Sequence, residues 1–265
     1  MNILPKKSLG QNFLIDNKIL SKIVDLGEIN QNDIVLEVGP GSGNLTENIL
    51  KKNPKKLIVI EKDKNLSELL KKKFNDSIEI INDDILTCNQ DIYYNKKIII
   101  FGNLPYNIST QILTSWIKID NLHNFCKKFI LMFQKEVADR ILGECNSKNY
   151  GRLSIISSWK MDIKKIIDIY PNSFYPPPKV NSSLLIFKPK YNYFKIKNPK
   201  NLEHVTNIFF NQRRKMIKKP LRFLFKNYEK VAEELSLDLS LRPQNLTSLT
   251  YFKICSYYEN LLNQT

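Results

Sequence analysis

The chain has 265 residues, 42% of them hydrophobic, so it is long and apolar enough to fold around a substantial core. It carries 41 Lys and Arg against 26 Asp and Glu, a formal net charge of +15. No apolar run approaches 18 residues, the four cysteines form no CxxC pair, and there are two histidines. These features argue against a membrane span, a disulfide framework and a metal centre. With no signal-like apolar core at the start, we expect a cytoplasmic protein with free thiols.

From residue 34 onward, short apolar runs alternate with stretches of helical spacing. The runs predict buried strands, and the spacing between them predicts helices over 44–52, 64–73 and 109–119. This alternation is typical of an α/β fold, a Rossmann-like parallel sheet with helices on both faces. The expected strands are 34–38, 57–61, 78–81, 97–101 and 128–133, with two more near 162–170 and 182–187.

A glycine-rich turn, EVGPGSGN (37–44), follows the first of these strands. Gly39, Gly41 and Gly43 allow a tight turn and a close approach to a ligand. The spacing differs from a dinucleotide fingerprint, and no Gly-Lys-Ser/Thr ending marks a phosphate loop. The segment therefore indicates either a nucleotide-type loop without a phosphate cradle or an ordinary strand–helix turn.

Acidic residues follow the next two strands. Glu61 comes 22 residues after Gly39, where a carboxylate can accept both ribose hydroxyls. Asp84 can accept the exocyclic amine of an adenine, and Ile85 can line one face of the ring. Each acid alone could also be a surface or turn residue. Together with the glycines they predict a nucleoside ligand without a diphosphate, and S-adenosylmethionine fits best.

The segment FGNLPYNIS (101–109) begins at the end of the fourth expected strand. Adenine N6 is a poor nucleophile, because its lone pair is delocalised, so a site that alkylates it must aim that lone pair. The Asn103 side chain and the Leu104 carbonyl can accept the two N6–H groups, Pro105 makes the loop rigid, and Tyr106 can stack on an unstacked base. The alternative is a rigid turn with a core tyrosine.

The C-terminal part is basic and helical. The segment 188–201 is polar with two prolines, so it predicts a boundary between domains 1–190 and 191–265. Residues 190–230 hold twelve Lys and Arg and two Glu, a net +10, which indicates either a polyanion partner or a solvated helix face. Beyond the boundary, 202–229 and 230–262 are expected to be helices with loops, and Pro220 should begin or break one.

The chain resembles the rRNA adenine N6,N6-dimethyltransferases of the KsgA family over nearly its whole length. The matching stretches are KKSLGQNFL (6–14), EVGPGSG (37–43), VIEKD (59–63), FGNLPYNIST (101–110), FQKEVADRI (133–141), NSFYPPPKVNSS (172–183) and NQRRKM (211–216). The resemblance implies a class I methyltransferase domain over 1–190 and a small all-α rRNA-binding domain over 191–265. It also implies S-adenosylmethionine-dependent dimethylation of two adjacent adenines in the 3′-terminal hairpin loop of small-subunit rRNA, within a pre-30S particle. Nothing in the sequence suggests an oligomer interface, so we expect a monomer.

The resemblance assigns further residues to the site. Asn12 and Leu14 would cover the cofactor, Gly39 would contact it, Glu61 and Asp84 would bind its ribose and adenine, and Asn103 would lie beside its methyl group. Phe174 would stack on the target base opposite Tyr106, although the neighbouring Tyr175 could also take this place. In the second domain the rRNA contacts would come from Arg213, Arg214 and Lys215.

Three alternatives stay open. An Erm-type methyltransferase of large-subunit rRNA typically carries Asn-Ile-Pro-Tyr/Phe, whereas Leu104 stands at the second position here. A ribosome-assembly checkpoint factor could bind the immature subunit alongside, or in place of, the chemistry. A DNA adenine methyltransferase would usually carry Asp/Asn-Pro-Pro-Tyr/Phe and a larger recognition region.

Overall fold

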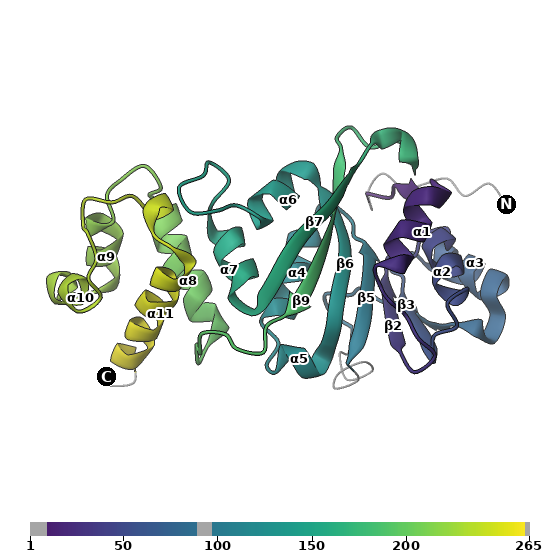
Figure 1. The fold of residues 1–265 in the computed structure, drawn as a ribbon, viewed down its shortest axis with the longest axis horizontal. Helices are drawn as coiled ribbons and strands as arrows, with labels where there is room; N and C mark the ends of the chain where they lie inside the picture. The colour runs from purple at the N-terminus through teal and green to yellow at the C-terminus, as the bar shows by residue number, and fades with distance from the viewer. Residues whose placement is uncertain (1–9, 89–96, 263–265) are drawn as a thin grey trace. The chain divides into compact units, whose positions relative to one another are not determined.

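The computed structural model describes residues 10–88 and 97–262, which fold into two compact units (Figure 1). The first unit comprises Met1–Ala138 and Asp162–Pro189, and the second comprises Asp139–Met161 and Lys190–Thr265. The strands of the first unit are β1 (Phe13–Leu14), β2 (Ile34–Val38), β3 (Lys56–Ile60), β4 (Glu79–Ile81), β5 (Ile98–Asn103), β6 (Cys126–Gln134), β7 (Met161–Ile169), β8 (Phe174–Tyr175) and β9 (Ser182–Pro189).

Helices lie on both faces of the sheet, as the alternating pattern predicts. They are α1 (Asn17–Asp25), α2 (Asn44–Leu50), α3 (Lys64–Phe74), α4 (Ser109–Ile117) and α5 (Leu122–Phe125), and α6 (Lys135–Ile141) continues from β6 into the second unit. Those from α2 to α5 connect the parallel strands. Acidic residues cap two of them: the Asp16 carboxylate accepts N–H groups at the start of α1, and Asp63 does so at the start of α3.

Within the described residues, the central sheet has seven strands in the order β4-β3-β2-β5-β6-β9-β7. The strands from β4 to β6 are parallel, and β9 runs antiparallel to β6. The carboxyl ends of β2, β3, β4 and β5 therefore meet at one edge of the sheet. Ligands of such folds bind outside this edge, so the topology brings the predicted site residues together.

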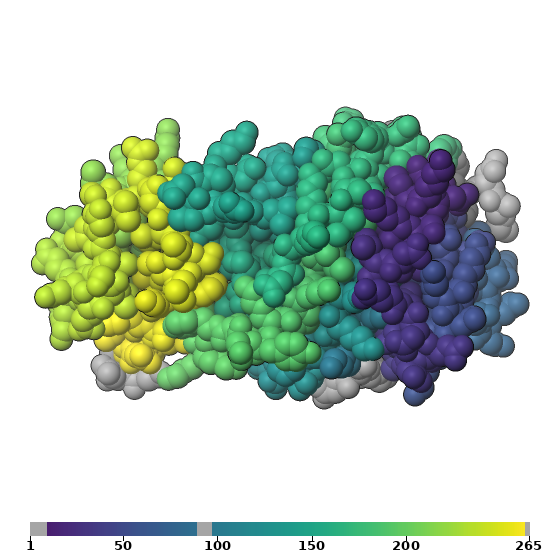
Figure 2. Space-filling model, in the orientation of Figure 1, coloured from purple at the N-terminus to yellow at the C-terminus, as the bar shows by residue number. Residues whose placement is uncertain are grey.

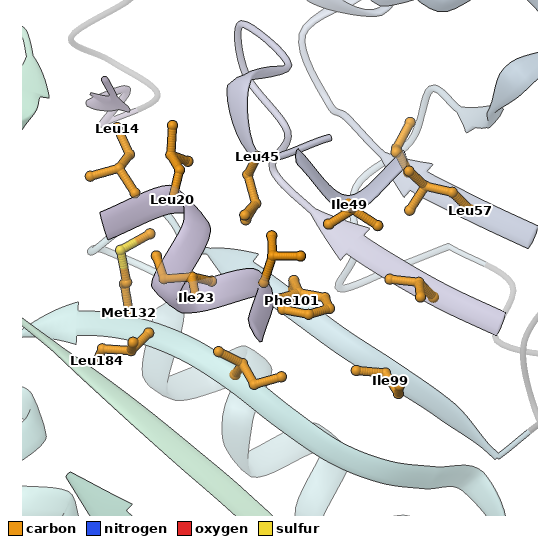
Figure 3. Packing of buried hydrophobic residues seen from close by; sticks show 14 of the residues in the cluster. Leu14, Leu20, Ile23, Leu45, Ile49, Leu57, Ile99, Phe101, Met132 and Leu184 are labelled. Carbon is orange, nitrogen blue, oxygen red and sulfur yellow. The ribbon is translucent and has the colours of Figure 1, made fainter. Parts of the chain in front are cut away.

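One face of the sheet is covered by α1, α2 and α3. Leu20 and Ile23 of α1 and Leu45 of α2 pack against strand residues that include Phe101 and Met132 (Figure 3). On the opposite face, Trp116 of α4 packs against Phe129 of β6, with ring centroids 5.2 Å apart. Because both faces are buried, the strands are nearly continuous apolar runs rather than alternating ones.

The second unit is helical. It contains α7 (Arg152–Lys160), α8 (Pro199–Phe210), α9 (Lys218–Leu224), α10 (Tyr228–Glu234) and α11 (Ser248–Leu262). Tyr251 of α11 is buried against Phe209 and Phe210 of α8. The buried Glu259 carboxylate accepts the N–H groups of Lys197 and Asn198, which joins the start of α8 to α11. In Figure 2, α11 is yellow and the α9–α10 segment is lime green.

Two features of the second unit differ from the sequence prediction or refine it. Residues 139–161, expected to belong with 1–190, cluster with 190–265, because α7 packs on α8 and α11. The Trp159 indole also donates to the Phe194 carbonyl at 2.8 Å. Pro220 lies in the first turn of α9, where its missing N–H costs no helical hydrogen bond.

Candidate functional site

The glycine turn after β2 adopts backbone angles that favour glycine. Gly39 and Gly41 have φ values of 70° and 57°. A Cβ on Gly41 would come within 2.7 Å of the Phe13 ring, and a Cβ on Gly39 would lie 3.4 Å from the Asn103 carbonyl oxygen. The turn therefore runs between the end of β5 and residues 10–14, which we call the opening segment.

Glu61 follows β3 and is 6% exposed. One carboxylate oxygen accepts the Gly41 N–H at 3.2 Å, and the other accepts the Asp63 N–H at 2.8 Å. Burial raises the pKa of the Glu61 carboxyl, and these two N–H groups oppose that rise. The Lys62 N–H opposes the rise as well, so the carboxylate is held against the glycine turn by backbone donors.

Asp84 lies just beyond β4 and is also held on both oxygens. One oxygen is 2.8 Å from the Lys62 ammonium, and the other accepts the Leu86 N–H at 3.0 Å. The hydrogen bond from Lys62 is the main cause that lowers the pKa of Asp84. Ile85 is buried beside it. The group is therefore an ionised acceptor in a defined orientation.

Asn103 is the last residue of β5, and its side-chain amide is oriented by the opening segment. The Nδ2 group donates to the Asn12 carbonyl at 2.7 Å. A carbonyl oxygen can only accept, so the NH₂ half of the amide must face Asn12 and Oδ1 must be the other atom. The hydrogen bond therefore leaves Oδ1 available as an acceptor.

Tyr106 is positioned by the antiparallel strand β9. Its hydroxyl lies 2.6 Å from the Ser182 hydroxyl, which is fully buried. Burial raises the pKa of Tyr106, and the bond to Ser182 partly opposes that rise. The Pro105 carbonyl accepts the Ile108 N–H at 3.1 Å, which closes the turn. The ring is thus held by a group far away in the sequence.

These groups line one cavity in the first unit. The cavity lies at the edge of the sheet where β2, β3, β4 and β5 end, and the opening segment forms part of its lining. The predicted site residues that it brings together are Asn12, Gly39, Gly41, Glu61, Asp84, Ile85, Asn103, Leu104, Pro105 and Tyr106. The glycine turn and the Asn-Leu-Pro-Tyr loop therefore share a cavity.

Two predicted residues do not line this cavity. Leu14 of β1 pairs with Phe174 of β8, and both side chains are in the hydrophobic core, where Phe174 is 2% exposed. Opposed residues of an antiparallel pair share a face, so the next pair, Phe13 and Tyr175, lies on the other face. Phe13 lines the cavity and Tyr175 is 56% exposed. The structure thus places Tyr175, rather than Phe174, at the surface.

The cavity also contains residues that the sequence reasoning missed. Phe13 fills the space beside Gly41, and Gln11 donates to the Asp63 carboxylate at 3.2 Å. Lys62 is the cation that pairs with Asp84. Lys62 could have been identified from the sequence, because it directly follows Glu61. Phe13 and Gln11 could not, because tertiary contacts bring them to the cavity.

The chemistry of the cavity fits a nucleoside better than a phosphate ester. Among the described residues that line it, Lys62 is the one cation, and it is paired with Asp84. Glu61, Asp84 and Asn103 offer acceptors to hydroxyl and amine donors. No group of three or more His, Cys, Asp or Glu within residues 10–88 and 97–262 could hold a metal ion.

The Arg-Arg-Lys run of the second unit has two kinds of side chain. The Arg213 guanidinium donates to the Lys148 carbonyl at 2.6 Å and to the Gln244 side chain at 3.2 Å. Arg214 and Lys215 are exposed. Arg213 therefore joins two loops of its own unit, while its two neighbours face solvent. In the described part of the chain, no helix is long and apolar enough to cross a membrane.

The chain matches the family model described as ribosomal RNA adenine dimethylase over residues 3–260. It is 58% identical over 261 residues to "Ribosomal RNA small subunit methyltransferase A" of Pelagibacter ubique, covering 98% of this chain and 99% of that protein. A protein of the same name from a Wolbachia of Drosophila simulans is 41% identical, with 92% and 89% covered.

Solved structures show the same fold. A dimethyladenosine transferase from Plasmodium falciparum superposes with a TM-score of 0.78 and 26% identity, covering 94% of this chain and 98% of that one. The 23S rRNA methyltransferase ErmE superposes with a TM-score of 0.67 at 21% identity, covering 92% and 100%. At that identity the second likeness concerns the fold alone.

Proposed function

The chain belongs to the ribosomal RNA adenine dimethylase family, and from that premise we propose that it dimethylates N6 of two adjacent adenosines in the 3′-terminal hairpin loop of small-subunit rRNA. The methyl donor is S-adenosylmethionine, and the substrate is the pre-30S particle. The protein acts as a monomer in the cytoplasm. The observation that carries the proposal is the single cavity shared by the glycine turn, two oriented carboxylates and the Asn-Leu-Pro-Tyr loop.

The cofactor half of the cavity is formed by Glu61, Asp84 and the glycine turn. Glu61 is a carboxylate held by backbone N–H groups beside the glycine turn, where it can also accept from a ribose hydroxyl. Asp84 is held ionised by Lys62 and accepts an exocyclic amine, with Ile85 against the ring. When bound, S-adenosylmethionine would supply a methyl group on a sulfonium, with the neutral thioether as the leaving group, and N6 would lose one proton for each methyl group that it gains.

The target half is formed by the loop after β5. Asn103 Oδ1 and the Leu104 carbonyl accept the two N6–H groups, which turns the nitrogen lone pair away from the adenine ring. An acceptor fixed before the reaction also stabilises the positive charge that develops on N6. Because the Asn12 carbonyl has already oriented the Asn103 amide, little reorganisation remains when the base arrives.

Tyr106 provides the stacking surface for the extruded base, and Ser182 is its positioning residue. The Ser182 hydroxyl fixes the position of the phenol oxygen and so holds the end of the ring at one place in the cavity. Of the two candidates for the second stacking ring, Tyr175 is at the surface in this conformation and Phe174 is in the core. A stacking role for Phe174 requires β8 to separate from β1.

The second unit holds the RNA. Arg214 and Lys215 contact phosphates, which positions the substrate without selecting a sequence. Arg213 supports them by connecting the 147–148 segment to Gln244. The first unit transfers the methyl group and the second provides RNA affinity.

The test is methyl transfer to defined acceptors. We expect labelled methyl groups on unmethylated small subunits, up to four per particle, and none on large subunits or duplex DNA. Label on large subunits would support the Erm-type alternative instead. Tight binding to immature small subunits without any transfer would support a checkpoint factor. Mass spectrometry of the rRNA digest then distinguishes dimethyladenosine from monomethyladenosine.

A further inference from the structure

The second unit has a groove of about 880 Å³ beside α9, separate from the cavity described above. One wall is formed by α9 together with residues 212–216 before it, and another by the segment that carries Ser240 and Arg242. The Ile217 N–H donates to the Leu241 carbonyl at 2.7 Å, which joins the two walls. Ile217 and Leu221 are fully buried beneath them. The groove is therefore formed by the fold itself.

The charged residues that line this groove are all cations. The lining contains no carboxylate, and in the described part of the chain none of its cations takes part in an ion pair. Lys218 and Arg222 stand four residues apart on α9, where like charges destabilise a helix. Such a cluster suits a bound polyanion that neutralises it. The cations are Arg214, Lys215, Lys218, Lys219, Arg222 and Arg242.

Two large apolar side chains stand exposed among these charges. Phe223 is 74% exposed and Met216 is 59% exposed, and both line the groove. Phosphate contacts do not require an exposed aromatic ring, whereas a nucleobase gains by stacking on one. Proteins that bind single-stranded nucleic acid combine cations, which contact the backbone phosphates, with aromatic rings, on which the bases stack.

We propose that this groove binds an unpaired segment of RNA, with its phosphates on the α9 and Arg242 cations and one base stacked on Phe223. The proposal rests on the proposed function, since it names the part of the rRNA substrate that the second unit contacts. A continuous duplex buries the faces of its bases, so it can use the cations and not the ring. The groove therefore discriminates between unpaired and paired RNA.

The neighbouring Tyr228 ring contacts two of the groove cations. The Lys218 ammonium and the Arg222 guanidinium lie 5.8 Å and 5.7 Å from the centroid of the Tyr228 ring. These cation–π contacts orient two long side chains that would otherwise lose rotamer freedom on binding. The groove is thus partly preorganised for its ligand.

The experiment measures equilibrium binding of the full chain to a fluorescein-labelled single-stranded 10-mer RNA and to the matching duplex, over a series of KCl concentrations. Phe223→Ala should weaken binding of the single strand about 5- to 150-fold, with an unchanged salt slope and unchanged binding of the duplex. Arg222→Ala should reduce the magnitude of the single-strand salt slope by about 0.7.

Matched controls lie elsewhere in the same unit. Tyr191→Ala removes a comparably exposed ring, and Lys253→Ala removes an exposed cation of α11. Neither residue lines the groove, so both variants should bind like wild type. Circular dichroism melts establish that Phe223→Ala remains folded. Phe223→Tyr keeps a stacking ring and should restore binding.

The inference and the proposed function can fail separately. Equal binding by wild type and Phe223→Ala, or an equal loss for single strand and duplex, would overturn the groove assignment while methyl transfer to small subunits continued. Phe223-dependent binding to vesicles with 30% phosphatidylserine, without dependence in the RNA assay, would overturn it in favour of a membrane surface. Absence of methyl transfer with groove-dependent RNA binding intact would overturn the proposed reaction alone.

Discussion

The cavity at the sheet edge and the groove beside α9 use polar side chains in opposite ways. In the cavity, Glu61 and Asp84 each have both carboxylate oxygens engaged, and the Asn103 amide is turned by Asn12. In the groove, six cations share a surface without an ion pair among the described residues. Held groups suit a reaction that depends on orientation, whereas free cations suit a long, irregular polyanion.

The Arg213–Lys215 run shows both behaviours within three residues. Arg213 is held by two carbonyls and an amide, as the cavity groups are, and Arg214, one of the groove cations, faces solvent. Local sequence therefore does not distinguish the two kinds of arginine. The distinction comes from whether another loop of the fold lies within reach.

The largest expected effect is at Asn103. Asn103→Ala should lower the rate of methyl transfer at least 100-fold, because the oriented N6 acceptor is lost. Binding of S-adenosylmethionine, measured by calorimetry, should stay within a few-fold of wild type. Asn48→Ala, which removes an amide from α2 outside the cavity, is the control and should leave the rate unchanged. Loss of cofactor affinity in Asn103→Ala would move Asn103 out of the acceptor role.

The next effect separates the core-facing and outward-facing residues of β8. Phe174→Ala should lower the free energy of unfolding by about 3–5 kcal/mol, because the ring is buried beside Leu14. Tyr175→Ala should change it by about 0.5 kcal/mol or less. Urea unfolding measures both. Equal losses would show that β8 does not pair with β1 in the register Leu14–Phe174.

A buried carboxyl beneath the cavity predicts a dependence of stability on pH. Burial raises the pKa of Glu37 to about 8, although the Thr46 hydroxyl donates to it. The folded state therefore holds this proton more tightly than the unfolded state does. Its contribution to stability is complete below about pH 4.5 and is lost as the pH rises through 8.

Glu37→Gln keeps an acceptor for Thr46 and cannot ionise. Its free energy of unfolding should therefore gain on that of wild type as the pH rises from 5 to 8.5, by an amount on the order of a few kcal/mol. The pKa of Glu61 is also raised, so the stability of Glu37→Gln should still fall with rising pH, although less steeply than that of wild type. The exposed Glu68→Gln is the control. Parallel curves for Glu37→Gln and wild type would contradict the buried, protonated state.

The smallest effects compare the two arginines. Arg213→Ala should lower the melting temperature by a few degrees, because three hydrogen bonds between loops are lost. Arg214→Ala should leave the melting temperature unchanged and reduce the magnitude of the salt slope of RNA binding by about 0.7–0.9. Thermal melts and binding titrations on both variants test this contrast. If Arg213→Ala instead reduced the salt slope and Arg214→Ala lowered the melting temperature, then Arg213, and not Arg214, would contact the RNA.

Much of the first unit could be predicted because its signals are local. The strand expected at 34–38 is β2 with the same residues, and 64–73 lies within α3. Parallel topology then places the ends of β2, β3, β4 and β5 at one edge, which brought Glu61, Asp84 and Asn103 together as expected. Segment 139–161 was not predicted to join the second unit, since membership of a unit depends on contacts of α7 with α8 and α11.

The sequence by itself determined the strands from β2 to β6, the glycine turn, the acids at the strand ends and the Asn-Leu-Pro-Tyr loop, because periodicity and backbone restriction act between near neighbours. It predicted a parallel sheet throughout, and the antiparallel direction of β9 came only with the tertiary structure. Only the tertiary structure decided which face of β8 meets the core, which arginine is held, and which residues orient Asn103 and Tyr106. Those outcomes depend on contacts such as Asn103–Asn12 and Tyr106–Ser182, which join residues 91 and 76 positions apart. No local pattern encodes a partner at that separation.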